Sequence, residues 1–304
     1  PGSDKLSKLA AMRLLDRPYT VSEWMIPSPH DYGASVAPFA GVMASLQDWD
    51  GVFFFQYHGQ NKNWDIQGPH DFFSMNGHPA KLAVAGIAAN LFCRGDLQPL
   101  PSVVAGTMRQ APLPELAVTH RIGIDPQASD VGQASVPANR YHETPGQTVV
   151  WDASQQERAC VQINTPATRG LFGLIAGREF QSEGVRIRVG QVDRDYGCIL
   201  ISSTDGKPVE KSKTLLLTAV GRAENPDMIW NQDRTSVGRK WGKGPARVNG
   251  IAADLSLQAP VAAIYALDGA GNRLSQVEFH KQDTEASWHI GSEYQTLWYE
   301  IELE

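Results

Sequence analysis

The sequence predicts an α/β segment followed by an antiparallel β-sandwich, and three observations support this. Hydrophobic residues make up 42% of the 304 residues and charged residues 20%, so a sizeable core can form. The first hundred residues alternate helical periodicity with short apolar runs, whereas the remainder holds short β-type runs between turn signals. The 28 glycines and 19 prolines indicate many turns. We therefore expect two domains, residues 1–96 and 97–304, with 97–116 as the connecting segment.

The first domain is expected to run helix, strand, helix, strand, helix. Helical spacing of apolar residues marks 4–15 and 34–47, and a β-branched and aromatic run follows at 18–24. The run 50–58 is almost continuously apolar, which is typical of a parallel strand with both faces covered. The last helix, 79–92, begins at a proline, which is favoured in the first helical turn.

The second domain shows strand-like runs with no helix between them. Those predicted are Ala117–Ile124, Thr148–Asp152, Ala159–Asn164, Gly170–Ile175, Gly184–Val189, Cys198–Ser203, Lys213–Ala219, Val261–Leu267, Arg273–Phe279 and Leu297–Leu303. Asp205-Gly206 and the stretch 268–272 fit hairpin turns. Strands at this spacing indicate an antiparallel sandwich.

Charge and motif content argue against several classes of function. The net charge is −6 and the 27 basic residues are scattered, which argues against nucleic acid or an anionic membrane as a partner. No apolar run approaches the roughly 18–20 residues of a membrane helix. The three cysteines form no CxxC pair, and His58, His70 and His78 match no metal-ligand spacing. No signal-peptide pattern is present, so the sequence assigns no compartment, although an extracellular or periplasmic one is compatible.

Glu23 is the residue that we predict to carry chemistry. It lies at the C-terminal end of the run 18–24, directly before Trp24 and a loop of Pro, Ser and His. In barrel enzymes, catalytic groups project from this end of each strand. A carboxylate beside an aromatic side chain suits the nucleophile of a glycosidase. The alternative is a glutamate that only caps or braces the loop.

Three segments of the first domain also carry a resemblance to a known superfamily. They are Thr20-Val21-Ser22-Glu23-Trp24, Leu46-Gln47-Asp48-Trp49-Asp50-Gly51-Val52-Phe53-Phe54-Phe55, and a closing helix with Pro79, Lys81 and Phe92-Cys93-Arg94-Gly95-Asp96. Together they resemble the last two strand–helix units of a clan-A glycoside hydrolase. The resemblance implies the C-terminal units of a (β/α)8 barrel followed by the sandwich, with Glu23 as the nucleophile of a retaining mechanism.

The same resemblance implies that part of the active site lies outside this chain. A retaining glycosidase needs two carboxyl groups about 5–5.5 Å apart, and in this superfamily the acid/base belongs to an Asn-Glu pair ending the fourth strand. The chain has no strand-like segment before residue 18, and Glu224-Asn225 has the reversed order. We therefore expect the remaining barrel units from the same parent protein or a second chain, and no hydrolysis by this chain alone. The implied partner is a carbohydrate, and no metal or organic cofactor is implied.

Five further residues are predicted to contact substrate. Trp24 follows the nucleophile, and the resemblance places sugar contacts at Gln56 and His58, which end the second strand. His30 and Trp64 lie in loops on the same side, and the Trp64 ring could stack on a sugar. The alternative for Trp64 is a loop anchor.

The region Ile229–Pro245 combines aromatic and basic residues, including Trp241. Such a set could bind a sugar, which makes Trp241 a candidate contact in the sandwich, or it could pack a long loop against the first domain. The latter is favoured. A second hypothesis for the whole chain is a non-catalytic carbohydrate-binding or structural β-sandwich module.

Overall fold

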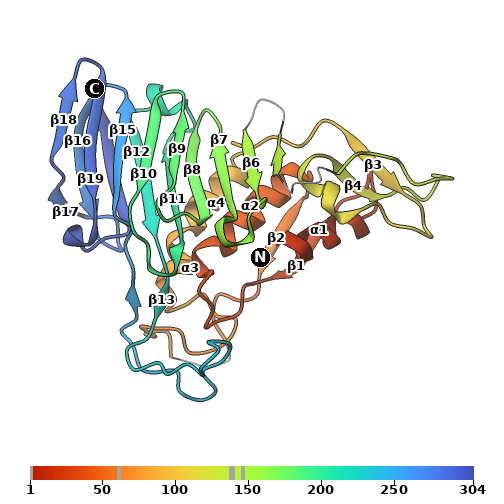
Figure 1. Ribbon diagram of the computed structural model, residues 1–304, viewed down its shortest axis with the longest axis horizontal. Helices are drawn as coiled ribbons and strands as arrows, with labels where there is room; N and C mark the ends of the chain where they lie inside the picture. The colour runs from red at the N-terminus through yellow and green to blue at the C-terminus, as the bar shows by residue number, and fades with distance from the viewer. Residues whose placement is uncertain (1–2, 60–62, 137–140, 145–147) are drawn as a thin grey trace.

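The computed structural model describes residues 3–59, 63–136, 141–144 and 148–304. The molecule is mostly sheet, with 34% of its residues in strands and 18% in helices. Two large antiparallel sheets are stacked, and the helices lie against the free face of the larger sheet (Figure 1). None of the described helices is long and apolar enough to cross a membrane.

The larger sheet has nine strands, each antiparallel to its neighbours. In spatial order they are β17 (Arg273–Gln276), β16 (Val261–Leu267), β20 (Trp298–Leu303), β12 (Thr214–Val220), β11 (Tyr196–Ser203), β8 (Thr168–Leu174), β7 (Cys160–Asn164), β6 (Val149–Asp152) and β5 (Tyr141–Glu143). The smaller sheet is also antiparallel. Its strands are β18 (Phe279–Gln282), β19 (Glu285–Ile290), β15 (Ala253–Gln258), β10 (Val185–Val189) and β9 (Glu179–Ser182).

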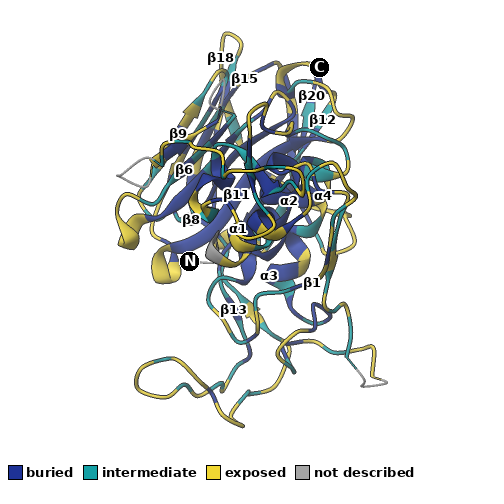
Figure 2. Cartoon of the chain, turned by 90° about the vertical axis from the view of Figure 1, so that its right-hand side faces the viewer, coloured by how far each residue is buried: buried dark blue, intermediate teal, exposed yellow. Residues whose placement is uncertain are grey.

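The nine-stranded sheet separates two hydrophobic cores. Successive residues of a strand point to opposite faces, so Ile199 and Ile201 of β11 join the core between the two sheets, whereas Leu200 joins the core beneath the helices. Every residue of β11 is consequently buried. Figure 2 shows β11 and the neighbouring α2 as the buried centre of the molecule. The structure is compatible with the predicted antiparallel sandwich, because the predicted runs from 148 to 219 and from 261 to 303 contain strands of these sheets. The prediction covers the smaller sheet poorly: it includes β10 but misses β9, β15 and β19, and it reaches only Phe279 of β18.

Residues 3–92 form the helical layer. It consists of α1 (Ser3–Met12), β1 (Thr20–Trp24), α2 (Val36–Leu46), β2 (Gly51–Phe54), α3 (Pro79–Ala83) and α4 (Ala85–Phe92). Helix α2 is apolar on all sides and buried along its whole length, as expected of a helix enclosed by other elements. It approaches α4 closely at Gly41, where a Cβ atom would lie 2.9 Å from the Ala88 carbonyl oxygen.

Short elements complete the chain. A two-stranded parallel sheet joins β3 (Val103–Gly106) to β4 (Arg121–Ile124), and β13 (Ala223–Glu224) pairs with β14 (Arg247–Val248) at the base of a long loop. Among the described residues, the 3-10 helices are η1 (Gly33–Ser35), η2 (Pro114–Val118), η4 (Gln156–Arg158), η5 (Asp193–Asp195), η6 (Val209–Lys211) and η7 (Ser292–Tyr294). Strand β3 falls within the segment 97–116 that was expected only to connect.

The prediction that the first domain forms the last strand–helix units of a (β/α)8 barrel is wrong. Strands β1 and β2 pair only with each other among the described strands, and the large sheets are antiparallel. A barrel needs eight parallel strands closed into a ring with helices outside. Here the helices pack on an antiparallel sheet instead: the Phe39 and Phe172 rings are 5.0 Å apart, and the Trp298 indole donates to the Ala83 carbonyl (3.2 Å). The apolar faces of the helices fit either arrangement, which is why their pattern misled.

Candidate active site

A bulge in β1 determines where Glu23 points. Val21 pairs with Val52 and Trp24 pairs with Phe54. Between these two pairs β1 therefore contains one residue more than β2. The extra residue leaves Ser22 and Glu23 both exposed, between the buried Val21 and Trp24. Bulges of this kind re-aim side chains and recur beside active sites. Among the described residues, no hydrogen bond or ion pair engages the Glu23 carboxyl group.

Trp24 itself is turned inward. Its side chain is 7% exposed, and its indole N–H donates to the Val36 carbonyl at 2.8 Å. It therefore fixes the end of β1 to the start of α2, and the structure places its ring in the core rather than beside Glu23 on the exposed face. The backbone N–H of Phe55 donates to the Trp24 carbonyl (3.1 Å), so the ends of β1 and β2 are held side by side.

The chain after β2 folds back on itself. The N–H of Gln56 donates to the Phe73 carbonyl (3.2 Å), and the N–H of Met75 donates to the Gln56 carbonyl (2.9 Å). Gln56 is consequently half-buried. The His58 and Trp64 rings are stacked with centroids 4.2 Å apart, and the Asn76 side-chain amide lies 3.0 Å from Nδ1 of His58. His58 and Trp64 were each predicted to contact substrate, and the structure brings their two side chains together.

Large aromatic side chains are exposed around these strand ends. Phe53 is 60% exposed, Tyr57 58%, Trp64 65% and Phe72 57%. The rings continue from β2 into the loop, because Phe55 lies 5.7 Å from Phe73 and Phe73 lies 6.3 Å from Phe72. We call this set the aromatic face; its members are Phe53, Phe55, Tyr57, Trp64, Phe72 and Phe73. Exposed apolar patches can mark interaction surfaces or ligand-binding grooves.

Of the two remaining predicted contacts, Trp241 lies at the border of this surface, whereas the His30 ring lies against Tyr32. Nδ1 of His30 accepts from the Tyr32 N–H (3.2 Å), and burial lowers the pKa of its imidazole, although Asp31 opposes the shift. Trp241 packs edge-on against Phe72 with centroids 5.5 Å apart, so the sandwich loop reaches the aromatic face. Whether either residue contacts a sugar stays a prediction.

The loop between β13 and β14 is fastened to the helical layer by charge. Arg234 donates to both carboxylate oxygens of Asp31 (3.2 and 3.0 Å) and lies 3.2 Å from Glu224. Its guanidinium stacks 4.1 Å above the Trp230 ring. Asn225 donates to the Pro69 carbonyl (2.8 Å). These contacts are those of a loop that packs against the N-terminal residues. Figure 1 shows this loop and the segment after β2 together below the sheets.

A buried polar group that was not among the predicted site residues lies in α3. Lys81 is 1% exposed, donates to the Ser28 hydroxyl at 2.8 Å, and has its pKa lowered to about 8 by burial, with Asp71 opposing. Burial and the neighbouring Lys81 lower the pKa of His78 to about 3. Burial raises the pKa of Asp71, but hydrogen bonds from Ser74 and Phe73 outweigh it, so the net shift is downward. A lysine within the apolar run 79–92 is the sequence signal for such a site.

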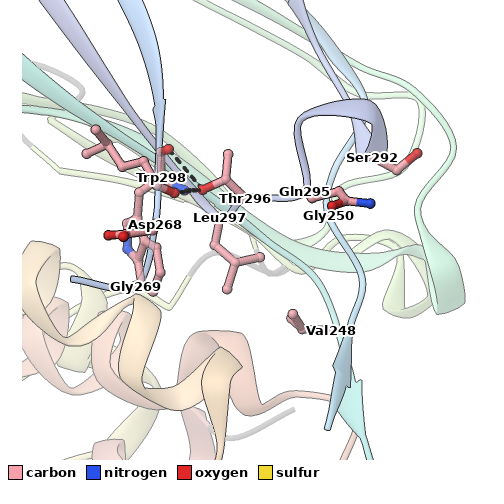
Figure 3. A pocket seen from close by; sticks show the side chains of 10 residues that line it. Val248, Gly250, Asp268, Gly269, Ser292, Gln295, Thr296, Leu297 and Trp298 are labelled. Carbon is pink, nitrogen blue, oxygen red and sulfur yellow. Dashed lines mark hydrogen bonds between the residues drawn. The ribbon is translucent and has the colours of Figure 1, made fainter. Parts of the chain in front are cut away.

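A separate hollow at the base of the sandwich contains none of the predicted residues. It measures about 340 Å³ and is lined by Leu267, Leu297 and Trp298 among others (Figure 3). Its polar groups serve the fold: the Thr296 hydroxyl donates to the Leu267 carbonyl and accepts from the Trp298 N–H, and Asp268 accepts from the Asn272 N–H. We therefore place the candidate site at the ends of β1 and β2.

Comparison of the chain with models of protein families, with curated proteins and with solved structures finds no match. In the part of the chain that the structure describes, no three His, Cys, Asp or Glu side chains are grouped as a metal site would require.

Proposed function

We propose that this chain contributes the nucleophilic carboxyl group and a sugar-stacking surface to a retaining glycoside hydrolase, and that the acid/base lies outside it. The observation that carries the proposal is the bulge that presents Glu23, without a described partner, at the strand end that adjoins the aromatic face. Aromatic rings are suited to stack on the apolar face of a sugar.

The reaction assigned to Glu23 is a displacement at the anomeric carbon. A carboxylate oxygen forms a bond to that carbon while the bond to the leaving oxygen breaks, and the leaving oxygen keeps the electron pair. An unactivated sugar leaving group needs a proton from a general acid at this step. A dinitrophenolate leaving group does not, because it is stable as an anion. A glycoside of that kind therefore tests Glu23 without the missing acid.

The test is covalent labelling with a 2-deoxy-2-fluoro glycoside that carries dinitrophenolate. We expect one equivalent of dinitrophenolate to be released and one glycosyl group to be added to the peptide that contains Glu23, as read by intact and peptide mass spectrometry. Glu23→Gln should give no adduct, whereas Glu157→Gln, which changes an exposed glutamate on η4, should label as the native chain does. An adduct on another residue, or none with any fluoro-sugar of a β-glycan series, would remove the assignment.

The exposure of the aromatic face also supports a second candidate function, carbohydrate binding without turnover. Trp64 is held by its stack on His58 and remains 65% exposed, which is the arrangement of a ring that receives a sugar. Retention of the chain on an insoluble polysaccharide, with no adduct in the labelling experiment, would favour this function over hydrolysis.

A further inference from the structure

A cavity distant in sequence from Glu23 lies between the helical layer and the outer half of the nine-stranded sheet. Its volume is about 440 Å³, which falls within the range of small-molecule sites. It is bounded by α1, α2 and η2 on one side and by β5, β6, β7 and β8 on the other. None of the residues assigned to the glycosidase site lines it.

The walls of this cavity are aromatic and rigid. Phe39, Trp151, Phe172 and Tyr196 line it, and none is more than 7% exposed. The Phe39 ring lies 5.3 Å from Trp151 and 5.0 Å edge-on from Phe172. The Tyr196 hydroxyl donates to the Ser35 hydroxyl at 2.5 Å, which fixes that ring as well. Because the walls belong to the core, the cavity is formed before any ligand arrives.

One polar group in the cavity has no hydrogen-bond partner among the residues that the structure describes. His142 on β5 is 8% exposed, and its Nδ1 atom is buried with no hydrogen bond to any described residue. A buried polar atom without a partner is uncommon and destabilising, so it calls for an explanation. Burial lowers the pKa of His142, so the ring is neutral near pH 7, and Nδ1 can donate or accept according to the tautomer.

The buried part of the cavity lining carries no charged side chain among the described residues. Among the described lining residues, Glu115 is the one charged side chain, and it is exposed. Burial raises the pKa of the Cys160 thiol to about 11, which keeps it neutral. An ion would lose its hydration here with no opposite charge to replace it. The cavity therefore selects against charged ligands.

We propose that this cavity binds a neutral, planar aromatic molecule with one hydroxyl group, whose ring lies among Phe39, Trp151 and Phe172 and whose hydroxyl group bonds to Nδ1 of His142. Aromatic walls favour a flat ring through edge and offset contacts, and the hydroxyl group supplies the missing partner. This inference is independent of the proposed glycosidase function.

The test compares 2-naphthol with naphthalene, which has the same rings but no hydroxyl group, by calorimetric titration at pH 7. We expect 2-naphthol to bind one site with an affinity about 5- to 10-fold above that of naphthalene, the size expected of one hydrogen bond. His142→Phe should abolish this preference and should raise the melting temperature of the unliganded protein, because the unpaired polar atom is gone. His280→Phe, on the exposed β18, is the matched control and should change neither.

A second variant tests whether the ligand occupies this cavity without changing His142. Ala153→Phe narrows the cavity from a partly exposed position and should weaken both compounds more than tenfold. Absence of saturable 2-naphthol binding to the native chain would overturn the proposal. So would equal affinity for the two compounds, or binding that survives Ala153→Phe unchanged.

Discussion

Two largely apolar strands of this chain, β2 and β11, have opposite surroundings. Every residue of β11 is buried, because the helices cover one face of the nine-stranded sheet and the smaller sheet covers the other. In β2, Val52 and Phe54 pack toward the core while Phe53 is 60% exposed. An apolar run thus reports that a strand is suited to burial, but not which of its faces the fold covers.

This difference bears on function. Parallel strands usually have both faces covered, so the uncovered face of β1 and β2 is available to another molecule. The same face carries Ser22 and Glu23 through the bulge in β1. The region around β11 has no comparable exposed apolar group and serves as the core. We therefore expect substitutions to affect stability near β11 and binding near β2.

The largest expected change in stability comes from shortening buried side chains of β11, and the same change in β2 provides the comparison. Leu200→Ala and Ile201→Ala each remove a fully buried side chain, one on each face of β11. Each should lower the free energy of unfolding by about 2–5 kcal/mol. Phe53→Ala should change it by no more than about 0.5 kcal/mol. Urea denaturation measures all three, and an equal loss from Phe53→Ala would show that the exposed face of β2 is covered in solution.

The second prediction concerns Lys81, the buried lysine of α3. The pKa of Lys81 is about 8 in the folded chain, below its ordinary 10.5, so between these values the unfolded state binds more protons. The contribution of Lys81 to the free energy of unfolding should therefore rise as the pH increases from about 8 to 10.5, by at most about 3 kcal/mol. The difference between native and Lys81→Met stability across this range isolates the effect from other titrating groups. A pH-independent difference would contradict the burial of a neutral amine.

The sequence predicted the strands of the larger sheet better than the smaller sheet or the packing of the helical layer, for a physical reason. Strands such as β7, β11 and β20 are apolar runs bounded by turn residues, so local pattern suffices to place them. The prediction nevertheless omits β5, β9, β15 and β19, and includes only the first residue of β18. In β15 the signal was present, because the buried Ala253, Leu255 and Leu257 alternate with more exposed neighbours in the two-residue period of a strand. The order strand, helix, strand, helix is correct for residues 18–92, except that the last predicted helix is two, α3 and α4, but it does not say what the helices pack on.

The candidate site was predictable only in part. The placement of Glu23 at a strand end follows from the local sequence, whereas the bulge depends on pairing with β2, which no local pattern encodes. Trp24 was expected beside the substrate and is instead in the core, because its hydrogen bond to Val36 depends on how α2 packs. The burial of Lys81 and His78 likewise arises from contacts with Ser28 and the surrounding loops.

A smaller loss of stability is expected from changes in the loop between β13 and β14, which packs against the N-terminal residues. Arg234→Gln removes the ion pairs to Asp31 and Glu224, whose side chains are partly exposed. The loss of stability should be about 1 kcal/mol or less, and it should shrink further in 1 M salt. Limited proteolysis within residues 225–246 should accelerate. Arg273→Gln breaks comparable pairs to Glu300 and Glu302 on the sandwich and should leave that cleavage unchanged.

The smallest effect on stability should accompany a measurable effect on binding. Trp64→Ala removes a side chain that is 65% exposed and touches the His58 ring, so its cost should stay within about 0.5 kcal/mol. Stacking of a sugar on the ring would be lost, and retention on an insoluble β-glycan should fall several-fold. Trp288→Phe, on the sandwich strand β19 and 4% exposed, should show the converse: lower stability and unchanged retention. If Trp64→Ala destabilises the chain without altering retention, the ring only anchors the loop, and the aromatic face loses its assigned role.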